Sequence, residues 1–566
     1  MKKWLNFVNE IKWYTKPKIE VDSKGNNHKW FPDGYLNIYY NCIEKFLQKK
    51  KDKIVIYTID NKLNLKKYTY SEINHLVNLF CNFINFHIDK INSKTKVMVH
   101  SSAGIESAIS MLGCAKLGIE FSVIFEELEK IAIEKRIKLF KPDLFITRKN
   151  IKEVKFLKKF MKKNVFSFTH LNNFENKNFF YKTKKINSTK NLFTLFTSGS
   201  TGIPKGVVHS NGGYLLYSKL TCKIKFGMNT KSTVLTASDA GWINGHTYSL
   251  FGPLSCGSKI ILLQSPLLML NTEIYKILRK INTNVIYLPV TLIRFMRETF
   301  QNKKIKMKSL KCVGSMGEPL AKSVGDWLNN FFYREKKAIV NTYFQTETGG
   351  IIASPQHNSG IKEFPNGSVG NTLNQLVKLN KLNNNKREIL ITKIWPGCMK
   401  KILNDKKTYN SYWTREGYFR MYDLGTKING NIYVHGRTDD VINIRGHRIG
   451  SGEVESIILQ NKNVKECCAV SLEEKLEGNS LTIFIVSKNR KISDKINRDL
   501  IENFGSFAIP KKIFFVNELP KTRSGKILRR LLREILVNKD KNFSDLSTIQ
   551  NKKSIKDIIK IINKNE

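Results

Sequence analysis

The stretch NLFTLFTSGSTGIPKG, residues 191–206, joins an apolar, strand-like run to a loop of hydroxyl residues, glycine, proline and lysine. Glycines let the backbone approach an anion closely and adopt positive φ, hydroxyls donate hydrogen bonds, and Lys205 supplies a point charge. The loop is therefore suited to hold a polyphosphate, and it differs from the GxxxxGKS/T loop of the P-loop NTPases. A Ser/Gly-rich linker is the simple alternative, but this composition directly after a strand favours a binding loop.

Short β-like runs alternate with amphipathic helical stretches on the N-terminal side of this loop. The runs are KVMVHS at 96–101, FSVIF at 121–125 and DLFIT at 143–147. Such alternation predicts an α/β fold with parallel sheets and crossover helices. Residues 148–190 are rich in lysine and asparagine and weakly periodic, so we interpret them as a surface excursion.

The pattern changes again near GRTDD at 436–440, where a Gly-rich, strand-like region gives way to a compact α/β pattern. A chain of 566 residues is too long for one hydrophobic core, because single cores stop growing near roughly 250–300 residues. We therefore predict an N-terminal domain over 1–438 and a smaller C-terminal α/β domain over 439–566. Near the end, LPKTRSGKILRRLLREI at 519–535 places a Ser-Gly loop before a basic helix.

The chain has a large positive net charge, but the distribution of that charge does not indicate a particular partner. The 96 Lys+Arg against 47 Asp+Glu give a formal net charge of +49, a balance that often indicates nucleic acid or an anionic membrane. The excess is lysine, however, and it is spread from Lys2 to Lys564 without one basic arm. We expect no nucleic-acid partner and only a general attraction of polyanions.

The cysteines and the apolar runs predict a cytoplasmic protein. The nine cysteines are scattered, with one adjacent pair at Cys467 and Cys468, which fits neither a metal site nor a disulfide framework. The basic start carries polar residues where a signal peptide needs an apolar stretch. The longest apolar neighbourhood, 260–270, falls short of the roughly 18 residues of a membrane span. We expect reduced thiols and no membrane partner.

The loop at 197–206 resembles the phosphate loop of the adenylate-forming (ANL) superfamily, which includes acyl-CoA synthetases, peptide-synthetase adenylation domains and firefly luciferase. Further segments follow in that superfamily's order and resemble the acetyl-CoA synthetase family in particular. They are HKWFPDGYLNIYYNC (28–42), TASDAGWINGHTYSLFGPLSCG (236–257), GSMGEPL (314–320), NTYFQTETGG (341–350), WPG (395–397), GRTDDVINIRGHRIGSGEVES (436–456), LPKTRSGKILRR (519–530) and DLSTIQNKKSIKDII (545–559). The resemblance covers essentially the whole chain.

The resemblance implies a fold and a reaction. The fold is α/β, with a large N-terminal domain of α/β subdomains plus a small β-barrel-like subdomain, and a small, mobile C-terminal α/β domain. The first part of 1–438 matches an acetyl-CoA synthetase type of N-terminal extension. The reaction joins a short-chain acid to CoA through an acyl-adenylate and yields AMP and diphosphate, with ATP and CoA as co-substrates and Mg²⁺ as cofactor.

The resemblance also assigns roles in ATP binding. Asp423 corresponds to the aspartate that accepts from the ribose hydroxyls, Arg437 and Arg448 to arginines that reach ribose and phosphate, and Glu347 to the Mg²⁺ carboxylate. The other candidate ATP residues are Thr197, Ser198, Gly199, Ser200, Thr201, Gly202 and Lys205 in the loop, Gly317, Glu318 and Pro319 against adenine, and Tyr343, Phe344, Gln345 and Thr346 beside them.

Catalysis and CoA binding are assigned to the C-terminal segments. Lys526, in the Ser-Gly loop, corresponds to the catalytic lysine that stabilises the attacking carboxylate and the α-phosphate, and acetylation of Lys526 is implied as a control. Asp439 corresponds to the hinge, and Arg445 and Gly446 to the pantetheine channel. The arginine-bearing segment that contacts CoA phosphates in the family has only Arg148 and its neighbour as counterpart, with nearby lysines as substitutes or weak CoA affinity as alternatives.

The acyl pocket departs from the family pattern. Positions that are usually Val, Thr, Val and Trp carry Ile243, Asn244, Met316 and Phe344, beside Trp242. Phe344 opens volume at the pocket floor, Ile243 and Met316 take volume back, and the Asn244 amide can bind a polar substituent. Acetate is the first expectation, with propionate, acrylate or 3-hydroxypropionate as alternatives, since one methylene discriminates by only about 1–3 kcal/mol.

Two other functions stay open at this point. One is an adenylating enzyme that passes the acyl group to an acceptor other than CoA, and the other is a non-catalytic relative that acts by binding. The retained Lys526, Glu347 and Asp423 argue against the second.

Overall fold

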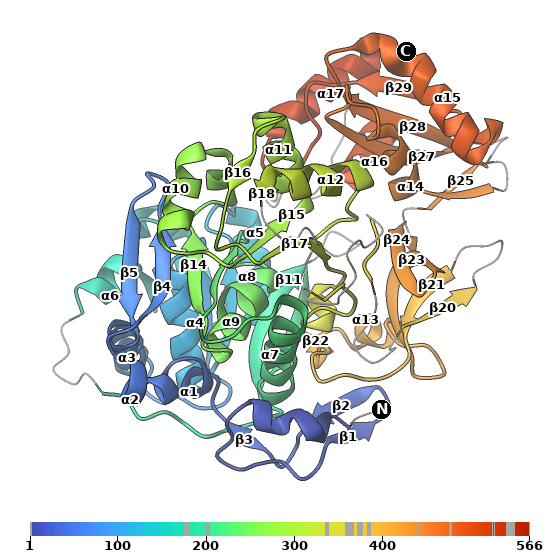
Figure 1. Ribbon diagram of the computed structural model, residues 1–566. Coiled ribbons are helices and arrows are strands. Elements are labelled where there is room, and N and C mark those ends of the chain that lie inside the picture. The colour runs from blue at the N-terminus through green and yellow to red at the C-terminus, as the bar shows by residue number, and fades with distance from the viewer. Residues whose placement is uncertain are drawn as a thin grey trace.

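The computed structural model describes most of the chain. The described residues are 3–128, 130–161, 164–174, 180–197, 204–333, 339–356, 367–370, 377–381, 387–438, 441–444, 447–474, 478–522, 525, 527–538 and 549–564. The predicted α/β class is confirmed, with a large N-terminal part and a smaller C-terminal part above it (Figure 1).

The first seven-stranded sheet carries the strand before the phosphate loop. Its order is β22-β12-β11-β7-β6-β8-β9, and β11, β7, β6, β8 and β9 run parallel while β12 and β22 are antiparallel to their neighbours. The bounds are β6 (Lys96–His100), β7 (Glu120–Ile124), β8 (Leu144–Thr147), β9 (Val165–Ser167), β11 (Asn191–Thr197), β12 (Lys205–Ser210) and β22 (Lys401–Ile402). The crossover helices are α4 (Ile105–Leu117) and α5 (Lys130–Phe140).

The second seven-stranded sheet supports the segments that follow the loop in sequence. Its order is β19-β17-β15-β13-β14-β4-β5, parallel except for β5. The strands are β4 (Ile54–Ile59), β5 (Leu65–Thr69), β13 (Thr233–Thr236), β14 (Lys259–Leu263), β15 (Val285–Pro289), β17 (Cys312–Met316) and β19 (Ile339–Asn341). The helices among them include α10 (Thr272–Lys280), α11 (Val290–Phe300) and α12 (Lys322–Phe331).

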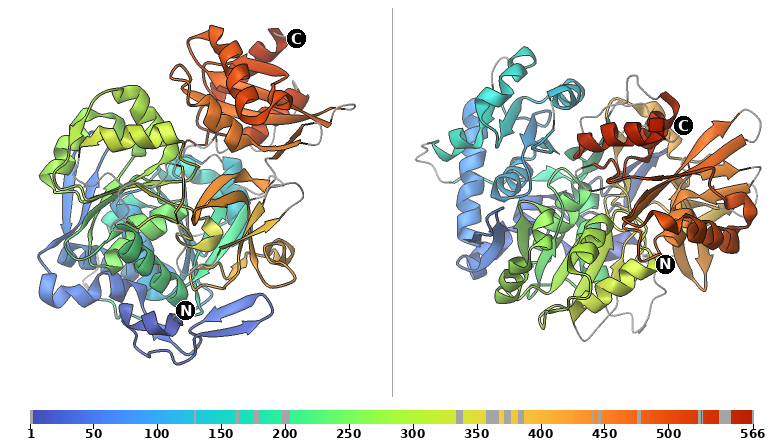
Figure 2. Two further views of the ribbon diagram at one scale, coloured as in Figure 1. Left: turned by 45° about the vertical axis from the view of Figure 1, so that its right-hand side comes forward. Right: turned by 90° about the horizontal axis from the view of Figure 1, so that it is seen from above.

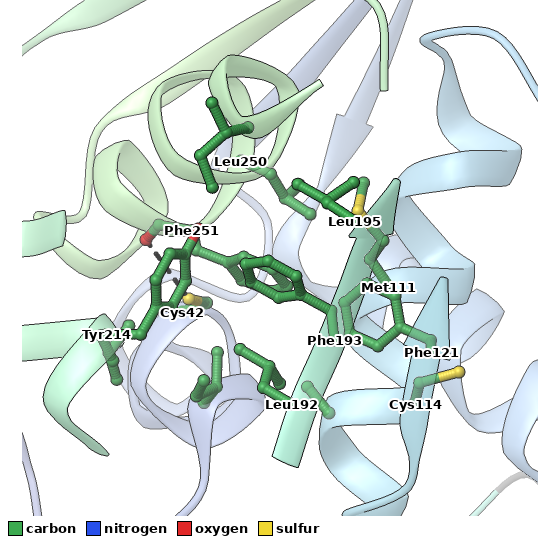
Figure 3. Close-up of a cluster of buried hydrophobic side chains, with 14 of the residues drawn as sticks. Cys42, Met111, Cys114, Phe121, Leu192, Phe193, Leu195, Tyr214, Leu250 and Phe251 are labelled. Carbon is green, nitrogen blue, oxygen red and sulfur yellow. Dashed lines mark hydrogen bonds between the residues drawn. The ribbon is translucent and has the colours of Figure 1, made fainter. Parts of the chain in front are cut away.

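Aromatic side chains fill the core beside the first sheet. Phe121 of β7 and Phe193 of β11 lie side by side with ring centroids 5.8 Å apart, and Tyr214 of α7 (Gly212–Phe226) and Phe251 face them (Figure 3). The Cys42 thiol lies 3.6 Å from the Phe251 carbonyl oxygen. The apolar run NLFTLF is therefore a central strand because both of its faces are buried.

A four-stranded antiparallel sheet completes the N-terminal part after the two seven-stranded sheets. It consists of β20 (Val377–Lys381), β21 (Arg387–Ile391), β23 (Phe419–Ile428) and β24 (Asn431–Arg437) in that order. The helix α13 (Lys406–Ser411) precedes β23. An N-terminal hairpin of β1 (Val21–Lys24) and β2 (Asn27–Trp30) lies against α13, where the Tyr409 hydroxyl donates to the Asn26 carbonyl at 2.7 Å.

The C-terminal part has its own sheet and two cores. The strands are β25 (Val441–Ile444), β26 (His447–Gly450), β27 (Glu466–Glu474), β28 (Gly478–Val486) and β29 (Lys512–Phe515), with α14 (Ser451–Ile458), α15 (Ser493–Phe504), α16 (Arg529–Asn538) and α17 (Lys552–Lys564). Cys467 packs in one core and Cys468 in the other, because successive residues of β27 point to opposite faces. All nine cysteines are free and buried.

The region 148–190 differs from the prediction of a surface excursion. It contains a 3₁₀ helix (Ile151–Lys159), the edge strand β9, and the short helix α6 (Phe168–Asn172), with Leu157 and Leu171 buried. The proposed boundary at 438/439 stays a prediction, since 439 and 440 lie outside the described residues. Every described helix is too short or too polar to span a bilayer.

Candidate active site

The ends of the phosphate loop are held by two antiparallel strands. Thr197, the last residue of β11, pairs with Lys205, the first residue of β12. The Thr197 hydroxyl oxygen is buried and has no hydrogen-bond partner among the described residues. Ser198, Gly199, Ser200, Thr201 and Gly202 lie outside the described residues. The loop therefore starts and ends at one fixed place, where an unpaired hydroxyl and a lysine meet.

Lys205 contacts the predicted metal carboxylate and a tyrosine that no motif marks. The Lys205 ammonium donates to the Tyr412 hydroxyl at 2.7 Å and lies 3.5 Å from Glu347 Oε1. The Tyr412 hydroxyl in turn donates to Glu347 Oε1 at 2.7 Å. Burial, reinforced by the Glu347 carboxylate, raises the pKa of Tyr412 well above its usual range, so the phenol stays protonated.

The turn that carries Glu347 is fixed by a buried histidine. His209 of β12 donates from Nε2 to the Thr346 carbonyl at 2.8 Å, and the Met399 amide donates to the Glu347 carbonyl at 2.8 Å. Burial lowers the pKa of His209 to about 4, so the imidazole is neutral. None of the sequence motifs marks His209, although it lies four residues after Lys205 in the same strand.

The predicted ribose residues come together around Asp423. The Tyr343 hydroxyl and the Gln345 amide each donate to Asp423 Oδ2 at 2.7 Å. Arg437, paired with Asp423 across β23 and β24, lies 3.6 Å from Oδ1 and donates to the Met421 carbonyl at 3.2 Å. Burial raises the pKa of Tyr343, as does the Asp423 carboxylate. Four residues from two distant segments thus form one polar cluster.

The turn after β17 is tied to α11. Gly317 has a φ of +91°, a backbone conformation that is strained for residues with a side chain. A Cβ at this position would meet open space. The Glu318 carboxylate, followed by Pro319, accepts from the Thr291 hydroxyl at 2.6 Å and pairs with Arg294 at 2.8 Å. The Glu318 side chain therefore faces α11, and the backbone of the turn stays open.

The predicted acyl-pocket residues lie at the junction of two apolar clusters. Phe344 packs against both the cluster that contains Ile243 and the cluster that contains Met316. Asn244 follows in α8 (Ile243–His246), and in the part of the chain that the structure describes nothing hydrogen-bonds to its buried Oδ1. Trp242 lies against Phe125, with ring centroids 5.1 Å apart. These residues are therefore mostly apolar, and the Asn244 Oδ1 is a hydrogen-bond acceptor available among them.

The predicted CoA contacts are less well supported. Arg148 donates to the Ser102 hydroxyl at 2.6 Å and pairs with Glu126 at 3.3 Å and Glu106 at 3.9 Å, so carboxylates of its own domain already hold it. Asp439, Arg445 and Gly446 lie outside the described residues, and only the backbone of Arg448 is described, in β26.

The loop of the predicted catalytic lysine reaches the N-terminal part. Lys526 itself lies outside the described residues. The Gly525 carbonyl, immediately before it, lies 3.1 Å from the Thr291 hydroxyl at the start of α11. A Cβ on Gly525 would lie 2.4 Å from the Thr291 methyl group, so the approach needs glycine.

Comparison with known protein families accounts for almost the whole chain. The model of the AMP-binding enzyme family matches residues 43–405, that of the AMP-binding enzyme C-terminal domain matches 453–526, and that of the acetyl-coenzyme A synthetase N-terminus matches 4–42.

Curated relatives and solved structures agree with these matches. The chain is 31% identical to an acetyl-coenzyme A synthetase of Bartonella henselae, covering 98% of this chain and 93% of that protein. It is 30% identical to one of Helicobacter pylori, covering 98% and 92%. Similar folds are an acetoacetyl-CoA synthetase from Streptomyces lividans (TM-score 0.81, 16% identity, 100% and 91% covered) and an anthranilate CoA ligase bound to anthranoyl-AMP (0.77, 18%, 88% and 97%).

Proposed function

The chain belongs to the AMP-binding enzyme family as an AMP-forming ligase of short-chain acids and CoA, and from that premise we propose acetate, or an acid of similar size, as its substrate. The reaction is ATP plus acid plus CoA to acyl-CoA plus AMP plus diphosphate. The observation that carries the proposal is the meeting of Lys205, Glu347 and Tyr412 at the ends of the phosphate loop, beside the Asp423 and Arg437 cluster.

In the first half-reaction, a carboxylate oxygen of the acid attacks the α-phosphorus of ATP, and the bond to diphosphate breaks. Asp423 accepts from the ribose hydroxyls, and Lys205 with the Thr197 hydroxyl neutralises and binds the departing phosphates. Lys526, arriving beside Gly525, stabilises the attacking carboxylate and the α-phosphate. The backbone of the Gly317 turn carries adenine.

The residues present fit a magnesium ion. Glu347 places one nearly buried carboxylate beside the phosphate loop, and Mg²⁺ is usually held by one or two carboxylates plus substrate phosphates and water. When bound, the ion neutralises phosphate charge. The protein's part is to free Glu347, because Lys205 and Tyr412 must turn from it toward the phosphates.

In the second half-reaction, the CoA sulfur attacks the acyl carbonyl and AMP leaves with the bonding electron pair. We assign the hinge to Asp439 and the pantetheine channel to Arg445 and Gly446. The ion pairs of Arg148 with Glu126 and Glu106 leave that arginine poorly suited to CoA phosphates, so surface lysines take this part.

The pocket supports a small acid whose size Phe344 and Met316 limit. Asn244 adds a preference, because its buried, unpartnered oxygen can accept from a hydroxyl on the substrate. We rank 3-hydroxypropionate above propionate and acrylate among the three-carbon acids. In the isosteric Asn244→Leu variant, the ratio of kcat/KM for 3-hydroxypropionate to kcat/KM for propionate should fall by about tenfold or more, so that propionate becomes the better substrate.

The test is acid-dependent ATP–pyrophosphate exchange, run with acetate, propionate, acrylate, 3-hydroxypropionate and butyrate. Exchange that peaks at a small acid, disappears in Lys526→Ala and is followed by thioester formation with CoA supports the proposal. Exchange without CoA consumption would indicate transfer to another acceptor. Absence of exchange with every acid would overturn it.

We also propose control by acetylation of Lys526, which would remove the ammonium and stop adenylation, and a cytosolic location. The nine free cysteines support the location, since thiols stay reduced in the cytosol. Acetylated protein should lose pyrophosphate exchange but still form thioester from a supplied acyl-adenylate; parallel loss of both would contradict this.

A further inference from the structure

One face of α11 contacts the C-terminal part of the chain. Thr291, Arg294, Phe295 and Glu298 occupy positions i, i+3, i+4 and i+7 and so share one side of the helix. We call these four residues the docking face. Figure 2 shows the C-terminal part, in orange and red, seated on the rest of the molecule, and Figure 1 places α11 at the junction.

Each end of the docking face touches a different C-terminal segment. The Thr291 hydroxyl meets the Gly525 carbonyl at 3.1 Å. Glu298, about two helical turns after Thr291, forms an ion pair with Lys465, just before β27. Contacts at two separate points restrict the orientation of a domain more than a single contact does.

The centre of the docking face covers a buried ion pair. The Lys521 ammonium lies 4.4 Å from the centroid of the Phe295 ring and pairs with Glu466. The side chains of Lys521 and Glu466 are only 7% and 8% exposed. An ammonium over an aromatic face is attracted by the ring, and here the ring also excludes water from the pair. Moving the C-terminal domain away would uncover both charges.

Arg294 links the docking face to the proposed adenine turn. It pairs with Glu318, which also accepts from Thr291. Burial opposes the charge on Arg294, but Glu318 and the C-terminal Glu455 and Glu466 outweigh burial and raise its pKa. Among the residues that the structure describes, the buried Arg294 Nε has no hydrogen-bond partner, which weakens this arrangement.

We propose that the docking face holds the C-terminal domain in the arrangement for adenylate formation, with Phe295 and Glu298 as positioning residues for the loop that carries Lys526. The inference rests on the proposed function. Both residues act through other groups, since neither lies in the ATP cluster. When the domain turns for the thioester step, the Phe295 and Glu298 contacts must break.

The test separates the two half-reactions. Glu298→Lys places two ammonium groups together, and the charge swap Glu298→Lys with Lys465→Glu restores the pair. We expect Glu298→Lys to lower pyrophosphate exchange by about fivefold or more, because fewer molecules are in the competent arrangement. Thioester formation from supplied acyl-adenylate and CoA should be unchanged or faster, and the swap should recover exchange.

The exposed pair of Glu273 and Lys276 on α10 supplies a matched control, 2.9 Å apart and away from the C-terminal part. Glu273→Lys should change neither half-reaction. Equal loss of both half-reactions in Glu298→Lys, or unchanged exchange, would overturn the proposal. If the unmodified enzyme shows no exchange with any acid, the proposed function fails instead.

A second measurement needs no turnover. Because all nine native cysteines are buried, cysteines introduced as Glu298→Cys and Lys465→Cys can be joined selectively by a short bis-maleimide. We expect the folded protein to crosslink rapidly, which a mobility change on a denaturing gel detects. The crosslinked enzyme should keep pyrophosphate exchange and lose thioester formation. Failure to crosslink, or a crosslinked enzyme that still makes thioester, would overturn the proposal.

Discussion

Tyr412 joins the two charged residues that the motifs mark for phosphate and metal. It accepts from Lys205 and donates to Glu347, which keeps the ammonium and the carboxylate apart by a hydroxyl rather than in a direct short pair. A relay of this kind lets both groups turn to a ligand without leaving either one unpaired. Tyr412 is therefore part of the proposed phosphate site.

Tyr412→Phe should weaken catalysis more than folding. A hydrogen bond to a charged group contributes about 1.5–3 kcal/mol, so we expect kcat/KM for Mg-ATP in pyrophosphate exchange to fall roughly tenfold or more. Tyr409→Phe is the matched control, because Tyr409 lies in the neighbouring α13 and its hydroxyl bonds the Asn26 carbonyl away from the site. Equal losses in the two variants would contradict a role for Tyr412 in the site.

Two buried histidines make stability depend on pH. Burial lowers the pKa of His209 to about 4 and that of His246 to about 3. In the unfolded chain both histidines titrate near their ordinary pKa. Below about pH 6.5 the unfolded state therefore binds more protons at these two residues than the folded state does. Stability is therefore lost as the pH falls from about 6.5 toward 4, and each histidine should cost roughly 2 kcal/mol at about pH 5.

Urea unfolding near pH 7.5 and near pH 5 measures this loss. His246→Gln cannot titrate in this range, so its unfolding midpoint should fall less on acidification than that of the unmodified protein. Far-ultraviolet circular dichroism at each pH shows that the starting state is folded. An identical pH dependence in both proteins would mean that other groups control the acid sensitivity.

At the scale of elements, fully buried strands were predictable and edge elements were not. The runs at 96–101, 121–125, 143–147 and 191–197 coincide with β6, β7, β8 and β11 within a residue because burial on both faces requires continuous apolar sequence. By contrast, β9 (Val165–Ser167) is three residues long with two only half buried, so it carries no readable pattern. Packing against β8, not local sequence, makes it a strand.

The same contrast holds for the site. Glu347, Asp423 and Arg437 could be named from their motifs, and the structure brings the last two together. Tyr412 could not, because it reaches Lys205 across 207 positions of sequence. The role of Arg148 in CoA binding stays a prediction; its ion pairs with Glu106 and Glu126 could not be read from the sequence, because they depend on how β6, β7 and β8 align.

The hairpin of β11 and β12 holds the phosphate loop through close packing at Gly206. A Cβ there would lie 2.9 Å from the Leu403 Cβ and 3.0 Å from the Thr194 methyl group. Gly206→Ala should therefore push β12 away from its neighbours, cost about 1–3 kcal/mol of unfolding free energy, and displace the adjacent Lys205. We expect pyrophosphate exchange to fall along with the urea midpoint.

A second substitution tests whether the loss comes from this contact. Thr194→Ser removes the methyl group and keeps the hydroxyl that donates to Glu120. In a double-mutant cycle, Thr194→Ser should recover part of the stability lost in Gly206→Ala. Additive effects of the two changes would show that the methyl contact is not responsible.

At the scale of the whole molecule, the charge of +49 is a property of the entire surface, because lysines occur on every part of the chain. Such a field does not specify a partner, but it raises the local concentration of anions, most strongly for those of high charge. ATP and CoA carry several negative charges, whereas a short-chain carboxylate carries one. The field should therefore favour the two nucleotides over the acid.

This difference predicts how catalysis depends on salt. Raising the ionic strength from about 0.01 M to about 0.1 M shortens the Debye length from about 30 Å to about 10 Å. We expect kcat/KM for ATP and for CoA to fall several-fold over that range and kcat/KM for the acid to change little. Sucrose at equal osmolarity is the control, since it leaves the field unscreened.

A short DNA duplex added at constant ionic strength should inhibit only weakly, because no basic arm is present in the sequence to bind it. Tight inhibition by the duplex would mean that the lysine excess serves a nucleic acid, and equal salt dependence for all three substrates would mean that it does not steer the nucleotides.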